Sequence, residues 1–498
     1  MRVLLTHGYF LAEDAKEQQL MRPYPPLGIL YLAAYLEERG ISATVFDSTF
    51  SSRLGLERHL VDTRPEVVGV YTNLMTKRAV LGIVRFIRER LPGTRVVLGG
   101  PEVTHHAEKF LEHGADVIVV GEGEETMTAL VQAWEQGTPL AEVAGIVFRD
   151  QGGVVRTPKR ALLRSLDELP MPKRDALDLT PYLRAWREKH GTSAISISTM
   201  RGCPYTCRWC SRAVYGGTYR RRSPKLVVDE IELVTQRYRP DSLWFVDDVF
   251  TINHGWLEAL TVELERRNLR VRYECITRAD RMNERVAALL KRSGCFRVWI
   301  GAESGSQKIL DAMDRRVKVE QVGDMIRLCK GLGIETGTFI MLGYPGETEA
   351  DIDATIDHLK RSDPDHFTIT VAYPIKGTPY WEDVRDDIVE DRPWEETTDR
   401  EQRLRRPHSD LYYQCAVARV VNEVRSYQLA RKAGGRPTLQ EARHRVQALV
   451  AGAGMRAAPV LSALQARATG FLRPPPKAPP PPPPAPLIPL RRRPPAPG

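Results

Sequence analysis

Short apolar runs alternate with amphipathic segments along the first third of the chain. The runs that predict strands are residues 2–8, 41–47, 65–73, 94–101 and 115–125, and the segments that predict helices are residues 26–40, 78–93 and 125–137. Strands that alternate with helices in this way predict a parallel, doubly wound sheet of the Rossmann-like kind over residues 1–150. Because ligands bind beyond the carboxyl ends of such strands, the loops at 71–74, 99–102 and 121–124 are candidate binding loops.

A second alternating pattern follows. Its strands are predicted at residues 193–199, 241–248, 270–277, 296–303, 335–342 and 365–374, with helices such as 225–238, 285–294 and 321–333 between them. Six such units are fewer than a closed eight-fold barrel needs, so a partial βα barrel is expected over 193–390. The segment 151–192 reads as a linker, since Pro170 and Pro172 break any helix there.

The rest of the chain changes character. Strand patterns stop at about residue 390, and residues 391–470 predict a helical region. Residues 471–498 contain 14 prolines. That composition predicts a disordered or polyproline II tail, with a ligand for a proline-recognition domain as an alternative. The net charge is +9, yet residues 401–498 hold 17 Lys/Arg against 4 Asp/Glu. The mildly acidic remainder argues against a nucleic-acid-binding core.

No segment has the length of a membrane span or the apolar core of a secretory signal, so we expect a cytoplasmic protein without a membrane contact. The seven cysteines are odd in number, which argues against a disulfide framework. We expect four of them to be reduced structural thiols: Cys275, Cys295, Cys329 and Cys415.

The remaining cysteines, Cys203, Cys207 and Cys210, form a CxxxCxxC motif directly after a predicted strand. Thiolates are the usual ligands of iron–sulfur clusters. Three protein ligands leave one iron of a four-iron cubane without a protein ligand. That iron can bind a substrate, as the open coordination position of a zinc ion can. A structural zinc site is the alternative, together with chance spacing. It needs a fourth ligand, and the nearest histidine, His190, lies upstream across the predicted strand.

With this motif and several strand ends, residues 193–390 resemble the radical S-adenosylmethionine (SAM) superfamily. The resemblance implies a 4Fe–4S cluster on the three cysteines, with SAM chelating the fourth iron. It implies SAM contacts at the ends of the second, fourth and fifth barrel strands and at the aromatic residue before the third cysteine: Trp209, Asp247, Asp248, Glu303, Ser304 and Gly343. Two alternatives stay open, because the aspartates could cap the next helix and Glu303 could be a structural ion-pair partner.

The first domain resembles the cobalamin-binding domain that precedes many radical SAM enzymes, on the strength of residues 21–40, the TNL triplet and the Gly99-Gly100 turn. The resemblance implies cobalamin contacts in three strand-end loops: Thr72, Asn73, Leu74, Gly99, Gly100, Gly121 and Glu122. The loop His7–Phe10 lacks the Asp-x-His-x-x-Gly motif of domains with a histidine ligand. We therefore expect cobalamin without one, and read His105 and His106 as loop or helix-start residues.

Together the resemblances imply a cobalamin-dependent radical SAM enzyme that methylates an unactivated carbon of a small-molecule or natural-product substrate. Such an enzyme also needs an external electron donor, such as flavodoxin or ferredoxin. Oxidative cyclisation of a tetrapyrrole or related substrate, as in the anaerobic Mg-protoporphyrin monomethyl ester cyclase, is the alternative. A tRNA methylthiotransferase is disfavoured because no cysteine precedes Cys203. A non-enzymatic cobalamin sensor would leave the cysteine motif unexplained.

Overall fold

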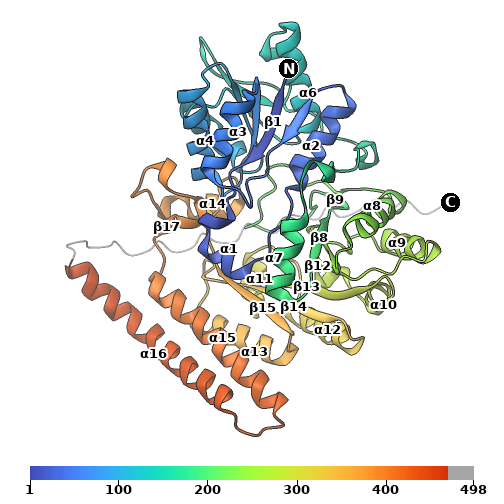
Figure 1. The fold of residues 1–498 in the computed structure, drawn as a ribbon. Helices are drawn as coiled ribbons and strands as arrows, with labels where there is room; N and C mark the ends of the chain where they lie inside the picture. The colour runs from blue at the N-terminus through green and yellow to red at the C-terminus, as the bar shows by residue number, and fades with distance from the viewer. Residues whose placement is uncertain (469–498) are drawn as a thin grey trace, which may run out of the picture.

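Two sheets organise the computed structural model, which describes residues 1–468 (Figure 1). The predicted tail at 471–498 lies outside the described residues. The first sheet has the order β2-β1-β3-β4-β5-β6-β7. Its strands are β1 (Val3–His7), β2 (Ala43–Val45), β3 (Val67–Tyr71), β4 (Arg95–Gly99), β5 (Val117–Val119), β6 (Ile146–Asp150) and β7 (Gly153–Arg156). The first five run parallel, and β6 and β7 are antiparallel additions at one edge.

Helices cover both faces of this sheet, because successive residues of its strands point to opposite sides. One face packs on α2 (Leu27–Glu38) and α6 (Glu124–Gln136), which contribute Ile29 and Met127. The other face packs on α3 (Arg53–Thr63), α4 (Lys77–Arg90) and α5 (Val103–Glu112). Burial on both faces explains why the strands read as continuous apolar runs.

The predicted linker 151–192 contains structure that the sequence analysis missed. The two residues between β6 and β7 form a hairpin turn, with Asp150 paired to Gly153. Gly152 therefore belongs to a hairpin turn, for which glycine is a common residue, and Gly153 begins β7 rather than an open linker. Further on, α7 (Thr180–His190) packs beside β8 (Ala194–Ile197).

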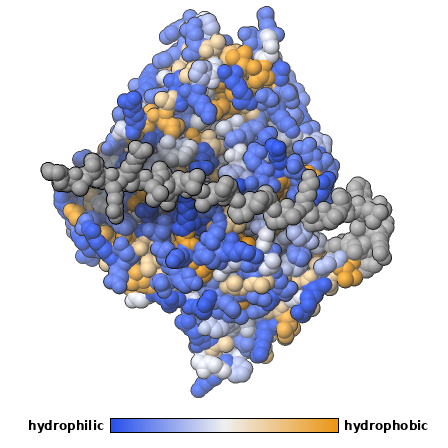
Figure 2. Space-filling view, turned by 180° about the vertical axis from the view of Figure 1, so that it is seen from behind, coloured by the Kyte–Doolittle hydropathy of each residue, from blue (hydrophilic) through white to orange (hydrophobic). Residues whose placement is uncertain are grey.

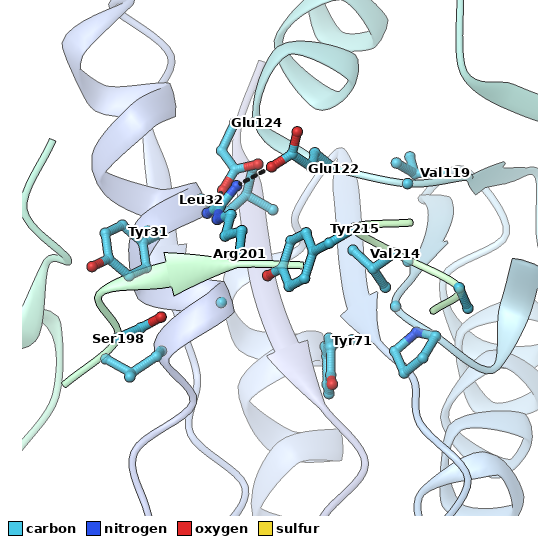
Figure 3. A pocket seen from close by; sticks show the side chains of 18 of the residues that line it. Tyr31, Leu32, Tyr71, Val119, Glu122, Glu124, Ser198, Arg201, Val214 and Tyr215 are labelled. Carbon is cyan, nitrogen blue, oxygen red and sulfur yellow. Dashed lines mark hydrogen bonds and ion pairs between the residues drawn. The ribbon is translucent and has the colours of Figure 1, made fainter. Parts of the chain in front are cut away.

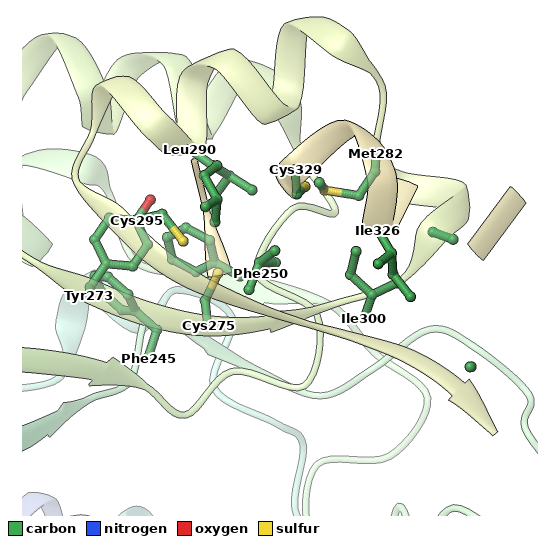
Figure 4. Packing of buried hydrophobic residues seen from close by; sticks show 14 of the residues in the cluster. Phe245, Phe250, Tyr273, Cys275, Met282, Leu290, Cys295, Ile300, Ile326 and Cys329 are labelled. Carbon is green, nitrogen blue, oxygen red and sulfur yellow. The ribbon is translucent and has the colours of Figure 1, made fainter. Parts of the chain in front are cut away.

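The second sheet is all parallel, with the order β15-β14-β13-β12-β11-β8. Its other strands are β11 (Ser242–Phe245), β12 (Tyr273–Thr277), β13 (Cys295–Glu303), β14 (Glu335–Leu342) and β15 (His366–Val371). The helices between them are α8 (Pro224–Tyr238), α9 (His254–Arg266), α10 (Glu284–Arg292), α11 (Gln307–Ala312), α12 (Val319–Gly331) and α13 (Glu349–Ser362). Between strands and helices, Phe245 stacks on Phe250 at 4.6 Å beside the buried thiols of Cys275, Cys295 and Cys329 (Figure 4). The predicted α/β fold with a partial barrel is confirmed.

The C-terminal region is mainly helical, but its strands do not stop at 390. The two-residue strands β16 (Ile388–Val389) and β17 (Arg403–Leu404) pair antiparallel, and they are too short to produce a periodic pattern. The hairpin of α15 (Asp410–Lys432) and α16 (Leu439–Ala468) packs through α15 on α13 (Figure 1). Figure 2 shows a mainly hydrophilic surface with small, separate apolar patches. Within residues 1–468, no helix is long and apolar enough to cross a bilayer.

Candidate active site

A cavity of about 550 Å³ lies where the carboxyl ends of the two sheets' strands meet. The first sheet contributes the ends of β3, β4 and β5 and the start of α2, and the second contributes the ends of β8 and β11 with the cysteine segment between them. Its lining includes Gly99, Gly100, Gly121, Cys203, Cys210, Asp247 and Asp248. It also includes the residues labelled in Figure 3 as Tyr31, Tyr71, Glu122, Arg201, Val214 and Tyr215. The wall thus combines apolar and aromatic side chains with a few convergent polar groups, as small-molecule and cofactor sites do.

The cysteine segment starts from the two-residue strand β9 (Met200–Arg201). Gly202 has a φ of +83°, and a Cβ there would lie 2.4 Å from the Thr218 carbonyl oxygen, so only glycine fits. The backbone N–H of Cys210 then donates to the Cys207 carbonyl at 3.2 Å. Cys203 and Cys210 line the cavity, whereas Cys207 is buried behind them.

The three thiols suit a metal cluster. Burial raises the pKa of Cys210 to about 12, and the carboxylates of Asp248 and Glu303 act in the same direction. Burial also raises the pKa of Cys203. Such thiols stay neutral at physiological pH unless a cation takes the place of the proton, and ligation by iron deprotonates a thiol outright. The donor set therefore fits the predicted iron–sulfur cluster.

The two aspartates after β11 have different environments. Asp247 is buried and accepts hydrogen bonds from the backbone N–H groups of Thr199 (2.7 Å) and Met200 (3.2 Å). It also pairs with Arg221 at 3.3 Å. Both aspartates line the cavity, but Asp247 holds the backbone that leads into the cysteine segment, whereas Asp248 makes no hydrogen bond among the described residues.

Neither aspartate caps the following helix. That position belongs to Asn253, whose side-chain oxygen accepts from the Trp256 N–H at 2.9 Å. The helix-cap alternative is therefore wrong for both residues. Burial and the neighbouring Asp247 raise the pKa of Asp248. A cationic ligand group at this carboxylate would oppose that shift.

Glu303 ends β13 at an irregularity in the strand pairing and has a φ of +67°. Backbone strain of this kind at a non-glycine residue is concentrated at functional sites. Its carboxylate lies 3.8 Å from Arg315, so the ion-pair alternative and a ligand contact are compatible. The hydroxyl of Ser304 is turned to its own loop, where it accepts from the Ser306 N–H at 3.1 Å.

Four of the six predicted SAM contacts, Trp209, Glu303, Ser304 and Gly343, lie outside the cavity lining. Gly343 has a φ of +77°, and its N–H donates to Glu347 at 2.5 Å. Tyr413 packs so closely that a Cβ at Gly343 would lie 2.9 Å from its ring. Trp209 is half-buried, with its ring centroid 5.9 Å from the Arg315 guanidinium.

In the first domain, the predicted cobalamin residues separate into two groups. Gly99, Gly100, Gly121 and Glu122 line the cavity, and a Cβ at Gly100 would lie 2.4 Å from the Thr72 carbonyl oxygen. Thr72, Asn73 and Leu74 do not line it. The Asn73 side chain instead accepts from the Met75 and Thr76 N–H groups, so this loop closes on itself and presents Tyr71 to the cavity. Because these glycines carry no side chain and the wall is mainly apolar, the wall fits a large planar ring.

A buried ionic network joins the two domains, and the sequence analysis missed it. Arg201 donates to Glu122 at 2.8 Å and to Glu124 at 2.5 Å (Figure 3). Arg220 also donates to Glu122, at 2.7 Å. Burial alone would raise the pKa of Glu122, but the hydrogen bonds from Arg220 and Arg201 hold it below its usual value. The sequence feature that could have indicated this network is the charged residue Arg201, on the strand directly before Gly202 and Cys203.

The histidines considered in the sequence analysis lie away from the cavity. His7 contacts Asp47 at 2.9 Å. His106 lies 3.9 Å from Glu102 and 3.8 Å from Asp399, a grouping that could suggest a metal site. However, the Trp394 indole donates to His106 Nδ1 at 3.2 Å, so the ring proton of the neutral imidazole sits on Nε2, which faces the carboxylates. A metal at Nε2 would need that proton removed.

Comparisons with known proteins agree with this geometry. The family model for the radical SAM superfamily matches residues 197–359, and that for the B12 binding domain matches residues 21–131. An uncharacterized methyltransferase of Pyrococcus horikoshii is 30% identical over 72% of this chain and 78% of its own length. The anaerobic magnesium-protoporphyrin IX monomethyl ester cyclase of Rubrivivax gelatinosus is 29% identical over 73% of this chain and 66% of its own.

The same fold occurs in the cobalamin-dependent SAM radical enzyme OxsB with aqua-cobalamin and SAM bound. It has a TM-score of 0.69 and 17% identity, and the match covers 94% of this chain and 75% of that one. The cofactor set predicted from the sequence, a 4Fe–4S cluster with SAM and cobalamin, is confirmed by the two matched domains. From these domains and relatives, the chain belongs to the radical SAM enzymes that carry a cobalamin-binding domain.

Proposed function

We propose that this enzyme methylates an unactivated carbon of a small-molecule substrate inside the cavity between its two domains. The observation that carries the proposal is the shared wall, in which Cys203, Cys210 and Asp248 face the same space as Gly99, Gly100 and Gly121. When bound, the cluster and SAM supply a radical that removes a hydrogen atom, and cobalamin supplies the methyl group.

The chain's own residues perform placement and exclusion of water. The predicted roles are cluster ligation by the three cysteines and contact with SAM by Asp248 and Glu303, while Asp247 fixes the approach to the cysteine segment. Tyr31, Tyr71 and Tyr215 supply aromatic wall in the cavity. The proposal includes a cytoplasmic location and an external one-electron donor such as flavodoxin or ferredoxin. It keeps the predicted domain limits, except that β7 and α7 reduce the linker to 157–179.

Oxidative cyclisation is the second candidate, favoured by the likeness to the Rubrivivax cyclase. One experiment separates the two. Anaerobically reconstituted enzyme is given methyl-labelled SAM, cobalamin and a reductant, with candidate substrates followed by mass spectrometry. Methyl transfer predicts product that carries the label and gains one CH₂. A product that loses hydrogen and carries no label would instead establish the oxidative reaction.

A further inference from the structure

Two buried arginines converge on one of the three cysteines. Arg278 Nη1 lies 3.5 Å from the Cys207 sulfur, and Arg315 Nη1 lies 3.6 Å from it. Arg278 is 2% exposed and Arg315 is 7% exposed. Fully buried guanidinium groups are rare unless they are paired. Their convergence on a single thiol therefore calls for a chemical role.

Each arginine is held in place by further hydrogen bonds. Arg278 donates to Asp280 at 2.8 Å and to the Arg315 carbonyl at 2.6 Å, and its guanidinium stacks 3.8 Å from the Tyr205 ring centroid. Arg315 donates to the Gly301 carbonyl at 3.0 Å. Because the guanidinium is a rigid planar fork, fixing one nitrogen also fixes the direction of the other. Both forks therefore point a donor at the same sulfur.

The charges around the three cysteines are unequal. Asp280 compensates Arg278 and is partly exposed, whereas the carboxylate paired with Arg315, that of Glu303, lies at 3.8 Å. The carboxylate of Asp248 lines the cavity together with Cys203 and Cys210. The two guanidinium groups thus lie at Cys207, whereas the Asp248 carboxylate lies on the cavity side with the other two cysteines.

We propose that Arg278 and Arg315 are positioning residues that make the iron–sulfur cluster easier to reduce, by donating hydrogen bonds and positive charge to the Cys207 sulfur. Hydrogen bonds to the sulfurs and local charge set the reduction potential of such clusters. The step affected is the entry of one electron from an external donor such as reduced flavodoxin. The inference rests on cluster ligation in the proposed function and is independent of whether methyl transfer follows.

The test is a redox titration of the reconstituted full-length protein, in which the reduced cluster is followed by electron paramagnetic resonance. R278Q and R315Q should each lower the equilibrium constant for reduction at least tenfold, which is a midpoint about 59 mV more negative for a one-electron couple. R266Q is the control, because Arg266 is 64% exposed and pairs with Glu263 in the last turn of α9. Its midpoint should equal that of the wild type.

A further variant, for which the midpoint should shift in the opposite direction, keeps the test valid if an arginine variant folds poorly. D280N removes the carboxylate that compensates Arg278, so its midpoint should move to more positive values. If R278Q does not load with iron, R315Q and D280N carry the same test. Unchanged midpoints in fully loaded R315Q and D280N would overturn the inference. Shifted midpoints in an enzyme that transfers no methyl group would refute the proposed reaction while the inference stands, and a wild type without a cluster would refute both.

Discussion

Arg201 and Glu122 form a buried ion pair, with Nη1 and Oε1 2.8 Å apart, across the junction of the two domains. Arg201 lies two residues before the first cluster cysteine, and Glu122 lies at the end of a first-sheet strand. The pair thus fixes the cysteine segment relative to the cobalamin-binding edge. The separation between the cysteine segment and this edge matters, because the two cofactors of the enzyme must act on one substrate.

Removing the arginine should destabilise the native state strongly. R201M leaves the carboxylates of Glu122 and Glu124 buried with a partner missing, which costs about 3–5 kcal/mol. Urea unfolding should show a clearly lower midpoint. R266M is the control, because Arg266 pairs with Glu263 on the surface of α9 and is 64% exposed, so its removal should change the free energy of unfolding by about 0.5 kcal/mol or less. Equal effects of R201M and R266M would contradict the structural role.

The two aspartates after β11 should respond differently to alanine. D248A should weaken SAM binding by about tenfold or more, which is about 1.4 kcal/mol, while iron content is kept. D247A should instead reduce stability and iron retention, because hydrogen bonds to charged groups contribute about 1.5–3 kcal/mol each. Equilibrium dialysis with SAM and iron analysis of both variants check this. Normal SAM affinity in D248A would show that the carboxylate does not contact SAM.

Iron content should depend on three cysteines only. The reconstituted wild type should hold about four irons per chain, and a C203A/C207A/C210A variant should hold none. C329A is the control, since Cys329 packs in the barrel core among apolar side chains. Cluster retention by the triple variant would refute the assignment of the ligands.

Glu102 should make stability depend on pH. Burial raises the pKa of this carboxyl from about 4.5 to about 7, with nearby Asp399 acting in the same direction, while Lys77 and Lys376 oppose the shift. The native state therefore holds a proton that the unfolded chain has lost between these values. The free energy of unfolding from this group falls as the pH rises through that window.

In E102Q that contribution is removed. The difference in the free energy of unfolding between E102Q and the wild type should therefore grow in favour of the variant from pH 5 to pH 8, by about 1–3 kcal/mol since one pKa unit is 1.36 kcal/mol. His106 remains in both proteins, and burial lowers its pKa, so only the difference between the two is informative. E108Q, at an exposed position of α5, should show no such trend. A difference that does not vary with pH would contradict the shifted pKa.

Much of the framework was predictable because it follows from local sequence patterns. Apolar runs located the strands, and parallel strands bring their carboxyl ends to one edge, which placed Gly99, Gly121 and Asp248 in one cavity. The three cysteines form a contiguous motif.

Other features were not predictable from local patterns. The Arg201–Glu122 pair joins residues 79 positions apart, and no periodicity signals such a contact. The loop Thr72–Leu74 was expected to face cobalamin, but the Asn73 side chain folds the loop onto its own backbone. Whether those three residues contact cobalamin stays a prediction, as do the SAM contacts of Glu303, Ser304, Gly343 and Trp209.

The central claim is that the cluster and cobalamin occupy one cavity, and magnetic coupling tests it most directly. Protein loaded with both Co(II) cobalamin and the reduced cluster is compared by electron paramagnetic resonance with protein loaded with each alone. Because Cys203 and Gly121 line the same cavity of about 550 Å³, the doubly loaded spectrum should show faster relaxation and broadening of both signals. A doubly loaded spectrum equal to the sum of the two single spectra would contradict the account.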